Sequence, residues 1–285
     1  MALNRPIGLE MYTVGADFDK DPLGTLQKVA AVGYQIVELS PQGPTSKVPV
    51  ADIKKGLAET GLKNPSGHYL LPDLEAHLDE RINTARELGE QYMILSVPWV
   101  ADTSRFQGSS GNQMDMFRNM LNGLTLDDWK WNAEQFNKVG EQVKKAGLQL
   151  GYHNHNFEFR PIGDTTGYDE LLRLTDPELV ALQMDVGWVT VAGHDPIAYL
   201  KKYPGRYRLL HIKDFKKGFA PTTTLMGDTA PVPTELGRGG IDYSKILDAA
   251  PKDAIIYVEQ EPPFKEMPAL EAMKVDFDYL HNLKG

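Results

Sequence analysis

The sequence predicts a single-domain (β/α)8 barrel, the TIM-barrel architecture, and three observations support this prediction. Eight short apolar segments alternate with helix-like segments along the chain. Such alternation favours a parallel sheet whose strands are joined by helices. The length of 285 residues suits one barrel of eight units.

The first half of the chain supplies four predicted strands and three predicted helices. Leu23, Leu26 and Ala30 share one face of the first helix, and Gly33 ends it. The fourth strand, "YMILSVPWV", is apolar throughout, as expected when both faces of a strand are buried. The strands are expected at 7–14, 34–40, 62–70 and 92–100, and the helices at 21–33, 50–61 and 73–89.

The second half continues the pattern, beginning with a long helix. Trp129, Ala133, Phe136, Gly140 and Val143 form its apolar stripe. The strands are expected at 148–155, 180–187, 207–214 and 254–261, and the helices at 126–146, 167–175, 195–203, 242–250 and 268–283. Two connections, 101–125 and 215–240, are long for this fold, and both follow strand ends. We therefore expect them over the C-terminal mouth of the barrel, where long loops are usually functional.

Composition narrows the function classes. The chain has 30 basic and 39 acidic residues, a net charge of −9, which argues against nucleic acid as a partner. It has no cysteine, so disulfides and thiolate metal sites are excluded. No apolar run reaches the roughly 18 residues that span a bilayer, so no membrane partner is expected.

The N-terminal segment bears on localisation. "MALNRPIGLEMYTV" lacks the basic and apolar regions of a signal peptide. This favours the cytoplasm, and export with a leader outside this sequence stays open.

Polar side chains gather at the predicted strand ends, and in a barrel these ends converge on one opening. They are Glu38, His68, His153, His155, Glu158, Asp185, His211, Lys213, Glu259 and Glu261. Carboxylates crowded in a dry mouth would repel one another, and a divalent cation removes that conflict. Taken singly, Asp185 is better explained as a residue that satisfies backbone amides at a helix N-cap, and His211 as a hydrogen-bonded core histidine. Taken as a set on four successive strands, Glu158, Asp185, His211 and Glu259 predict a site for Mn²⁺ or Mg²⁺, with Zn²⁺ or Co²⁺ as alternatives.

The chain resembles the xylose-isomerase-like barrel family, often called sugar phosphate isomerases/epimerases. The resemblance covers nearly the whole chain and rests on "IGLEMYTV", "GYHNHNFEF", "MDVGWVTVAG", "LLHIKD", "ELGRGGIDY" and "YVEQEPP", in that order. It implies an eight-fold barrel with a Glu, Asp, His, Glu metal set, which matches Glu158, Asp185, His211 and Glu259. Related branches carry a glutamate at the position of Gly151 or Tyr152. This chain is similar to the branch with "HNHxFEF", which uses the later Glu158, and His155 is its rival.

The same mouth supplies candidates for catalysis. A divalent ion polarises a sugar carbonyl, and a nearby base removes the adjacent proton. His153 is the preferred base, because it resembles a histidine that transfers protons in the dehydratase branch. An alternative role for His153 is to orient Glu158, which is itself a catalytic candidate as well as a ligand. Lys213 shares a strand face with His211, so it either stabilises an oxyanion or neutralises a carboxylate.

Further mouth residues are predicted to bind substrate. Aromatic rings can stack on a sugar, and a guanidinium can bind a phosphate or a carboxylate. Trp188 and Phe215 are further aromatic candidates, with core packing the simpler explanation for Trp188. The predicted substrate-binding residues are Tyr12, Glu38, His68, Trp99, His155 and Arg238.

Four functions stay open from the sequence. The main one is a divalent-metal-dependent sugar isomerase or epimerase that deprotonates a C–H next to a metal-bound carbonyl or hydroxyl. The alternative is a lyase, dehydratase or deglycosidase that acts on a 3-keto sugar by β-elimination. An abasic-site endonuclease of the same barrel is disfavoured by the charge of −9, and a non-catalytic sugar-binding barrel also remains. A small carbohydrate is the expected partner, and homo-oligomer formation is left open.

Overall fold

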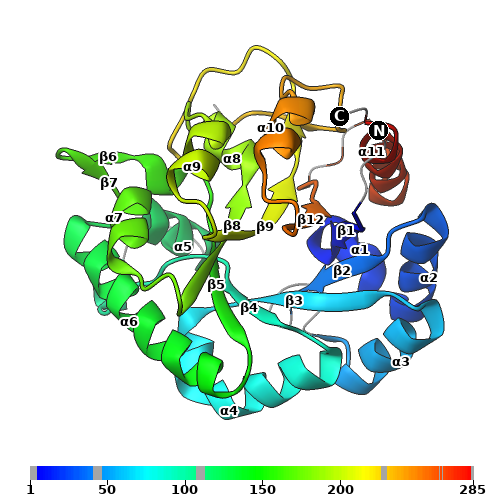
Figure 1. Cartoon of the computed structure of the whole chain (residues 1–285), viewed down its shortest axis with the longest axis horizontal. Helices are drawn as coiled ribbons and strands as arrows, with labels where there is room; N and C mark the ends of the chain where they lie inside the picture. The colour runs from blue at the N-terminus through cyan, green and yellow to red at the C-terminus, as the bar shows by residue number, and fades with distance from the viewer. Residues whose placement is uncertain are drawn as a thin grey trace.

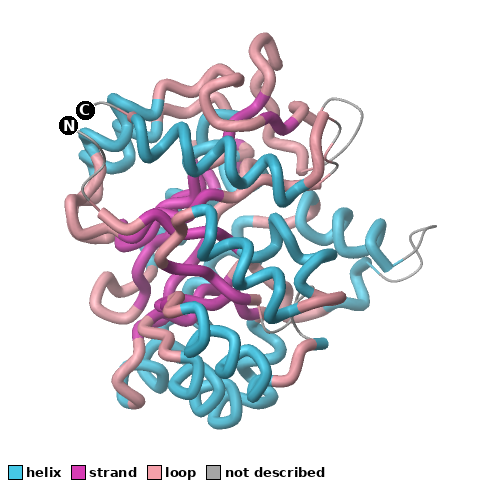
Figure 2. Tube along the Cα trace, turned by 90° about the vertical axis from the view of Figure 1, so that its right-hand side faces the viewer, coloured by secondary structure: helices cyan, strands magenta, loops and turns pink. Residues whose placement is uncertain are grey.

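Eight parallel strands close into a barrel with helices outside it, which confirms the predicted fold class (Figure 1). The computed structural model describes residues 5–40, 47–106, 113–225, 230–262, 264 and 266–283. Around the barrel the strands follow the order β1-β12-β9-β8-β5-β4-β3-β2. Figure 2 shows the strands as the central layer and the helices around them.

The elements follow the predicted alternation. The barrel strands are β1 Ile7–Glu10, β2 Ile36–Leu39, β3 Lys63–Tyr69, β4 Tyr92–Leu95, β5 Gln149–His153, β8 Val180–Asp185, β9 Tyr207–Ile212 and β12 Ile255–Val258. The α-helices are α1 Gly15–Phe18, α2 Pro22–Val32, α3 Val50–Thr60, α4 Leu71–Leu88, α5 Gln113–Asn122, α6 Leu126–Lys145, α7 Gly167–Leu174, α8 Val186–Val191, α9 Pro196–Lys202, α10 Tyr243–Ala249 and α11 Ala269–Asn282. The 3-10 helices are η1 Met11–Val14, η3 Thr103–Phe106 and η4 Phe157–Phe159. Two small ribbons pair β6 Pro161–Ile162 with β7 Thr165–Thr166, and β10 Asp214–Phe215 with β11 Pro233–Thr234.

Most barrel strands are shorter at their C-terminal ends than the sequence predicts. The clearest case is the first, expected to reach residue 14 but ending at Glu10. The Glu10 carboxylate accepts a hydrogen bond from the Tyr12 backbone N–H at 3.3 Å, and this bond begins η1. The apolar residues after Glu10 are therefore buried in a tight turn, and hydrophobicity alone does not distinguish that turn from strand.

The floor of the barrel interior is a small apolar layer. Ile36, Ile94, Leu209 and Tyr257 pack together there. At Gly151, a Cβ atom would lie 2.5 Å from Cδ1 of Ile94, so a larger residue there would displace the end of the Ile94 side chain. The polar residues lie nearer the C-terminal strand ends.

The connection at 101–125 is fixed at its C-terminal end. Thr125 and Asp128 form a reciprocal capping box at the start of α6. Arg105 Nη1 donates to Asp128 Oδ1 at 2.7 Å, which ties η3 to the same cap. Within this connection α5 buries Met120 and Leu121, as its apolar spacing predicts.

The two long connections meet in the described parts of the chain. The Leu225 N–H donates to Asn122 Oδ1 at 3.2 Å, which joins the 215–240 connection to the end of α5. Asn156, just after β5, donates to the carbonyl oxygens of Thr222 at 2.9 Å and Thr224 at 3.2 Å. These bonds tie both connections to the C-terminal side of the barrel. Residues 107–112 and 226–229 of these connections lie outside the described residues.

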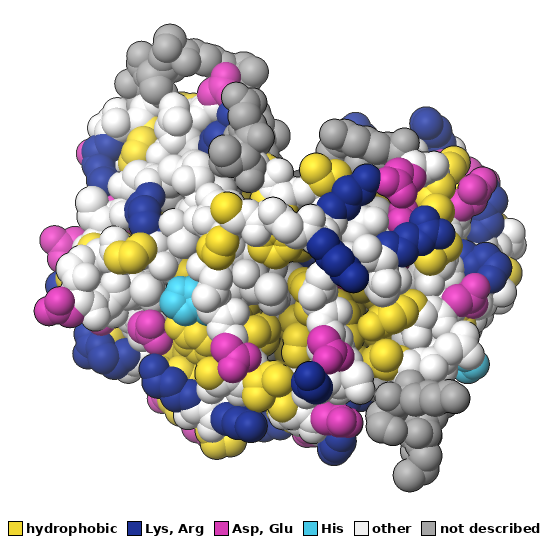
Figure 3. Space-filling view, turned by 90° about the horizontal axis from the view of Figure 1, so that it is seen from above, with side chains coloured by type: hydrophobic (Ala, Val, Ile, Leu, Met, Phe, Trp, Pro, Cys, Tyr) yellow, Lys and Arg dark blue, Asp and Glu magenta, His cyan; other side chains and the backbone are white. Residues whose placement is uncertain are grey.

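Two surface properties complete the description. No helix in the described ranges is long and apolar enough to cross a membrane. On the face in Figure 3, basic and acidic side chains lie among one another and do not separate into single-sign patches.

Candidate active site

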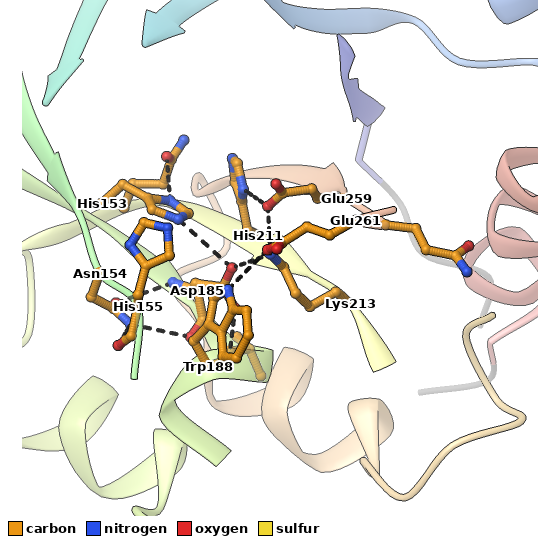
Figure 4. A network of polar contacts seen from close by, with 12 residues as sticks. His153, Asn154, His155, Asp185, Trp188, His211, Lys213, Glu259 and Glu261 are labelled. Carbon is orange, nitrogen blue, oxygen red and sulfur yellow. Dashed lines mark hydrogen bonds and ion pairs between the residues drawn. The ribbon is translucent and has the colours of Figure 1, made fainter. Parts of the chain in front are cut away.

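Four neighbouring strands, β5, β8, β9 and β12, bring four buried side chains together (Figure 4). His153 ends β5, Asp185 ends β8, His211 lies near the end of β9, and Glu259 directly follows β12. Asp185 pairs in register with His211. The sequence places these groups at strand ends, and barrel closure brings them to one point.

The two carboxylate oxygens of Asp185 have different surroundings. Its Oδ1 accepts the Trp188 N–H at 2.8 Å and thereby caps α8. Its Oδ2 accepts no hydrogen bond and lies 2.9 Å from Lys213 Nζ and 3.7 Å from His153 Nε2. Burial, the largest effect, raises the pKa of Asp185 to about 6, although Lys213 opposes the rise. One oxygen therefore stabilises the helix while the other faces the cluster.

The tautomer of His153 follows from its neighbour Gln183. The Gln183 Nε2 amide donates to both oxygens of Glu38, at 2.8 and 3.0 Å, so its Oε1 faces His153. His153 Nδ1 lies 2.9 Å from that Oε1 and must be the donor. Burial and then the positive charge of His211 lower the pKa of His153 well below 6.5. The neutral ring therefore has a free lone pair on Nε2, facing Asp185.

Lys213 places its ammonium group among three carboxylates. Its Nζ lies 2.9 Å from Asp185 Oδ2, 2.8 Å from Glu259 Oε2 and 2.5 Å from Glu261 Oε1. Burial opposes the charged amine, but attraction to these three groups outweighs it and raises the pKa of Lys213 well above 10.5. Glu261 also accepts the Trp188 indole N–H at 3.0 Å. Lys213 is thus a fixed positive charge at this position.

Glu158 lies apart from these contacts. It is buried in η4, and its Oε1 accepts the Tyr152 hydroxyl at 2.8 Å and the His155 N–H at 2.9 Å. Its Oε2 is buried without a hydrogen-bond partner. Glu158 is absent from the groups of described side chains whose donor atoms converge, so its role as a metal ligand stays a prediction.

The donor set itself suits a divalent cation. Ligand atoms of His153, Asp185, His211 and Glu259 all lie within 4.8 Å of one another, and all four residues are buried. Two imidazoles and two carboxylates match the preferences of Zn²⁺, Co²⁺ or Mn²⁺ better than those of Mg²⁺, which prefers oxygen. These four described residues therefore form a candidate metal site.

A second converging group lies beside the first. It comprises Glu10, Glu38, His68 and His211, so His211 belongs to both. The sequence missed Glu10, because its strand was expected to run on to residue 14. It also missed Gln183, although strand alternation puts Gln183 on the same face as Asp185.

The other predicted substrate-binding residues lie around the site in different ways. His155 is half-buried, with its ring centroid 5.0 Å from that of His153 and 6.2 Å from that of Trp188. Tyr12 is 39% exposed. Trp99 packs against Phe117, with ring centroids 6.0 Å apart.

Arg238 and two aromatic candidates have partners within the protein. Arg238 Nη1 pairs with Glu235 Oε2 at 3.1 Å, and its side chain is half exposed. Trp188 and Phe215 are buried, with ring centroids 5.1 Å apart. Lys213 Nζ lies 5.4 Å from the Trp188 ring centroid. A cation–π contact thus adds to the core packing predicted for Trp188.

The fold is a TIM barrel with a buried cluster of candidate metal-binding groups at its mouth. The chain belongs to the xylose isomerase-like TIM-barrel family, whose model matches residues 26–280. It is 27% identical to an inosose dehydratase of Mesomycoplasma hyopneumoniae over 291 residues, covering 96% of this chain and 92% of that protein. It is 33% identical to an inosose dehydratase of Clostridium perfringens over 147 residues, covering 48% of this chain and 49% of that protein.

A solved structure gives the same picture over the full length. A sugar phosphate isomerase/epimerase from Parabacteroides distasonis superposes with a TM-score of 0.77 at 25% identity. The superposition covers 98% of this chain and 99% of that one. Together with the family match, it identifies the chain as a member of a family of sugar isomerases, epimerases and dehydratases.

Proposed function

We propose that this chain is a divalent-metal-dependent enzyme that removes a proton next to the carbonyl group of a small keto sugar or keto cyclitol. The observation that carries the proposal is the position of His153, whose Nδ1 lies 2.9 Å from Gln183 Oε1. The Nε2 lone pair of His153 points into a buried cluster, 3.7 Å from Asp185 Oδ2. A base with a lowered pKa beside converging metal donors suits this reaction.

The chain's own residues would hold the ion. Asp185, His211 and Glu259 are the proposed ligands on β8, β9 and β12, and Glu158 remains the predicted fourth. When bound, a divalent ion supplies Lewis acidity that polarises a carbonyl and its neighbouring hydroxyl. Mn²⁺ or Mg²⁺ is expected from the carboxylates, and the imidazole donors add Zn²⁺ and Co²⁺ as alternatives.

The protein side chains account for the proton transfer. As the C–H bond breaks, the proton moves to His153 Nε2 and the electron pair moves toward the carbonyl oxygen. Lys213 keeps its positive charge nearby, because three carboxylates raise its pKa, and this charge stabilises the developing oxyanion. The buried ring of Trp188 covers one side of Lys213 and limits water there.

Elimination is the outcome that the relatives favour. After deprotonation, the bond from the β-carbon to its oxygen breaks, and that oxygen takes the proton held on His153 and leaves as water, or as the alcohol of a glycoside. Both inosose dehydratases cited above, one at 33% identity over about half of the chain and one at 27% over nearly all of it, support a keto cyclitol or a 3-keto sugar as substrate.

A second candidate function is isomerisation or epimerisation. Here the proton returns to carbon and nothing is expelled. The Parabacteroides structure, a sugar phosphate isomerase/epimerase that matches along the whole chain, favours this function. The two functions share the deprotonation and differ in the next bond that breaks.

One experiment tests the shared step and separates the two outcomes. The enzyme, loaded with Mn²⁺, is incubated in D₂O with an inosose and with a 3-keto-glucoside, followed by NMR and mass spectrometry. Elimination gives loss of the β-substituent and an absorbing enone, whereas epimerisation gives deuterium incorporation without loss. The matched control is Asp185→Asn, which should abolish both. Absence of exchange and of elimination with Mn²⁺, Zn²⁺, Co²⁺ and Mg²⁺ on these substrates would refute the proposal.

A further inference from the structure

Glu38 is the centre of a hydrogen-bond network inside the barrel. It lies on β2, its side chain is fully buried, and donors from three other strands converge on it. Ser66 of β3 donates to Oε1, and Gln183 of β8 donates to both oxygens. His211 Nε2 of β9 lies 2.5 Å from Oε2, and His68 Nε2 of β3 lies 3.2 Å from it. Its oxygens are thus occupied by groups of the protein.

The bond to His211 determines which nitrogen that ring offers to the site. His211 Nδ1 lies 2.7 Å from Glu259 Oε2, on the side of the candidate metal donors. A neutral imidazole carries one N–H, and a carboxylate can only accept. Gln183 donates to both oxygens of Glu38, so this carboxylate acts as an acceptor toward His211 Nε2. Both ring nitrogens of His211 therefore face a carboxylate, Glu38 at Nε2 and Glu259 at Nδ1, and a cation that takes the Nδ1 side leaves the Nε2–H bonded to Glu38.

We propose that Glu38 is a positioning residue that keeps the His211 proton on Nε2 and thereby reserves Nδ1 for a divalent cation. This inference rests on the proposed function. It replaces the predicted role of Glu38 in gripping the substrate. A carboxylate behind a metal-binding histidine fixes the ring's orientation and raises the basicity of the facing nitrogen.

The geometry separates this role from a merely structural one. Ser66 donates to the same carboxylate, yet it touches none of His153, Asp185 and Glu259. Ser66 therefore tests the network without touching the metal donors. Glu38 contacts His211 directly, whereas it reaches His153 through Gln183.

The test compares Glu38→Gln with Ser66→Ala in the full chain. Mn²⁺ and Zn²⁺ affinities are measured by calorimetry at one fixed pH, and His211 is read by ¹⁵N NMR of histidine-labelled protein without metal. For Glu38→Gln we expect metal affinity to fall about 10–100-fold, as for other such partners of metal ligands. We also expect the Nε2–H signal of His211 to weaken, because among the described contacts only Glu259, at Nδ1, then offers the ring a carboxylate. Ser66→Ala should change neither reading by more than about twofold.

Three results would overturn the inference or its basis. Unchanged affinity and an unchanged His211 tautomer in Glu38→Gln refute the positioning role. A raised KM at unchanged metal affinity returns Glu38 to the substrate. If the wild-type protein binds neither metal, the proposed function fails, and the tautomer reading still tests the Glu38–His211 link. If Glu38→Gln does not fold, Glu38→Asp serves instead, because its shorter side chain moves the carboxylate away from His211 Nε2. A metal affinity of Glu38→Asp equal to that of Ser66→Ala would refute the positioning role.

Discussion

Replacing Lys213 by methionine removes one positive charge from the candidate site and keeps a side chain of similar length. In the wild-type protein Nζ lies 2.8 Å from Glu259 Oε2 and 2.9 Å from Asp185 Oδ2. The variant leaves these buried carboxylates without that partner. The same two oxygens are the proposed ligands of the metal, so charge on the lysine and charge on a bound ion act on the same atoms.

The magnitude follows from a thermodynamic cycle. Removing one partner of a buried ion pair costs about 3–5 kcal/mol. We expect this loss in the metal-free protein, because Lys213 is only 4% exposed in its side chain. In the loaded protein the ion supplies positive charge to the same carboxylates, and the loss falls to about 1–2 kcal/mol. The difference of about 2–3 kcal/mol must appear as tighter metal binding, by about 30–150-fold at 1.4 kcal/mol per tenfold.

Urea unfolding with Mn²⁺ and with a chelator, together with calorimetric titration, measures both sides of the cycle. The matched control is Lys216→Met, because Lys216 pairs with Glu266 on the surface and both are about half exposed. An exposed pair of this kind contributes about 0–1 kcal/mol, so neither stability nor metal affinity should change much. Equal destabilisation with and without metal, or weaker metal binding in Lys213→Met, would show that the lysine and the ion do not share these carboxylates.

Three further predictions concern single side chains. His153→Ala should keep its metal and lose about 10²–10⁴-fold in kcat, the usual contribution of a positioned base, and loss of bound metal in a content assay would make His153 a ligand instead. Glu158→Ala leaves the Tyr152 hydroxyl and the His155 N–H without their acceptor, so the free energy of unfolding should fall by about 2–4 kcal/mol in urea titration. If metal affinity falls with it while Glu158→Gln restores stability but not affinity, Glu158 is the fourth ligand, as predicted. Burial raises the pKa of Glu90 to about 8, so the stability that its neutral form contributes is complete below about pH 4.5 and is lost as the pH rises through 8. Glu90→Gln should remove this loss, and urea unfolding at pH 5 and pH 8 that gives the same pH dependence in both proteins would contradict the assignment.

The sequence was sufficient to predict the barrel because its strands and helices differ in apolar period and in end signals. It was also sufficient to place Asp185, His211 and Glu259 at one mouth, since parallel strands must end on the same side. It could not resolve β5. The strand ends at His153, and the next residues form a 3-10 turn in which Glu158 accepts bonds from Tyr152 and His155. These short-range side-chain bonds stabilise the turn, and the alternation of apolar and polar residues does not predict them.

The hydrogen-bond network around Glu38 could not be predicted for a related reason. A glutamate at a strand end can face a ligand or the protein, and the outcome depends on what lies across the barrel. Here the facing residues are Gln183 and His211, about 145 to 173 positions away in the chain. Their register is set by closure of the barrel, so only the three-dimensional structure shows that the carboxylate is already occupied.

Charge balance explains why one site can hold both a lysine and a divalent ion. At pH 7 the described cluster contains three ionised carboxylates, those of Glu38, Glu259 and Asp185. The pKa of Glu38 is lowered well below 4.5, the pKa of Glu259 is also lowered, and the pKa of Asp185 is raised only to about 6. Opposing them are Lys213 and the two histidines His68 and His211, whose pKa values burial lowers but facing carboxylates raise to about 9 and about 10. A cation that binds His211 Nδ1 must displace the proton there, while the Nε2 proton stays with Glu38. Binding of the ion therefore adds two positive charges and removes one with the displaced proton. The carboxylate of Glu261, 2.5 Å from Lys213, balances the net gain of one positive charge. The lysine thus need not leave the site when the metal binds.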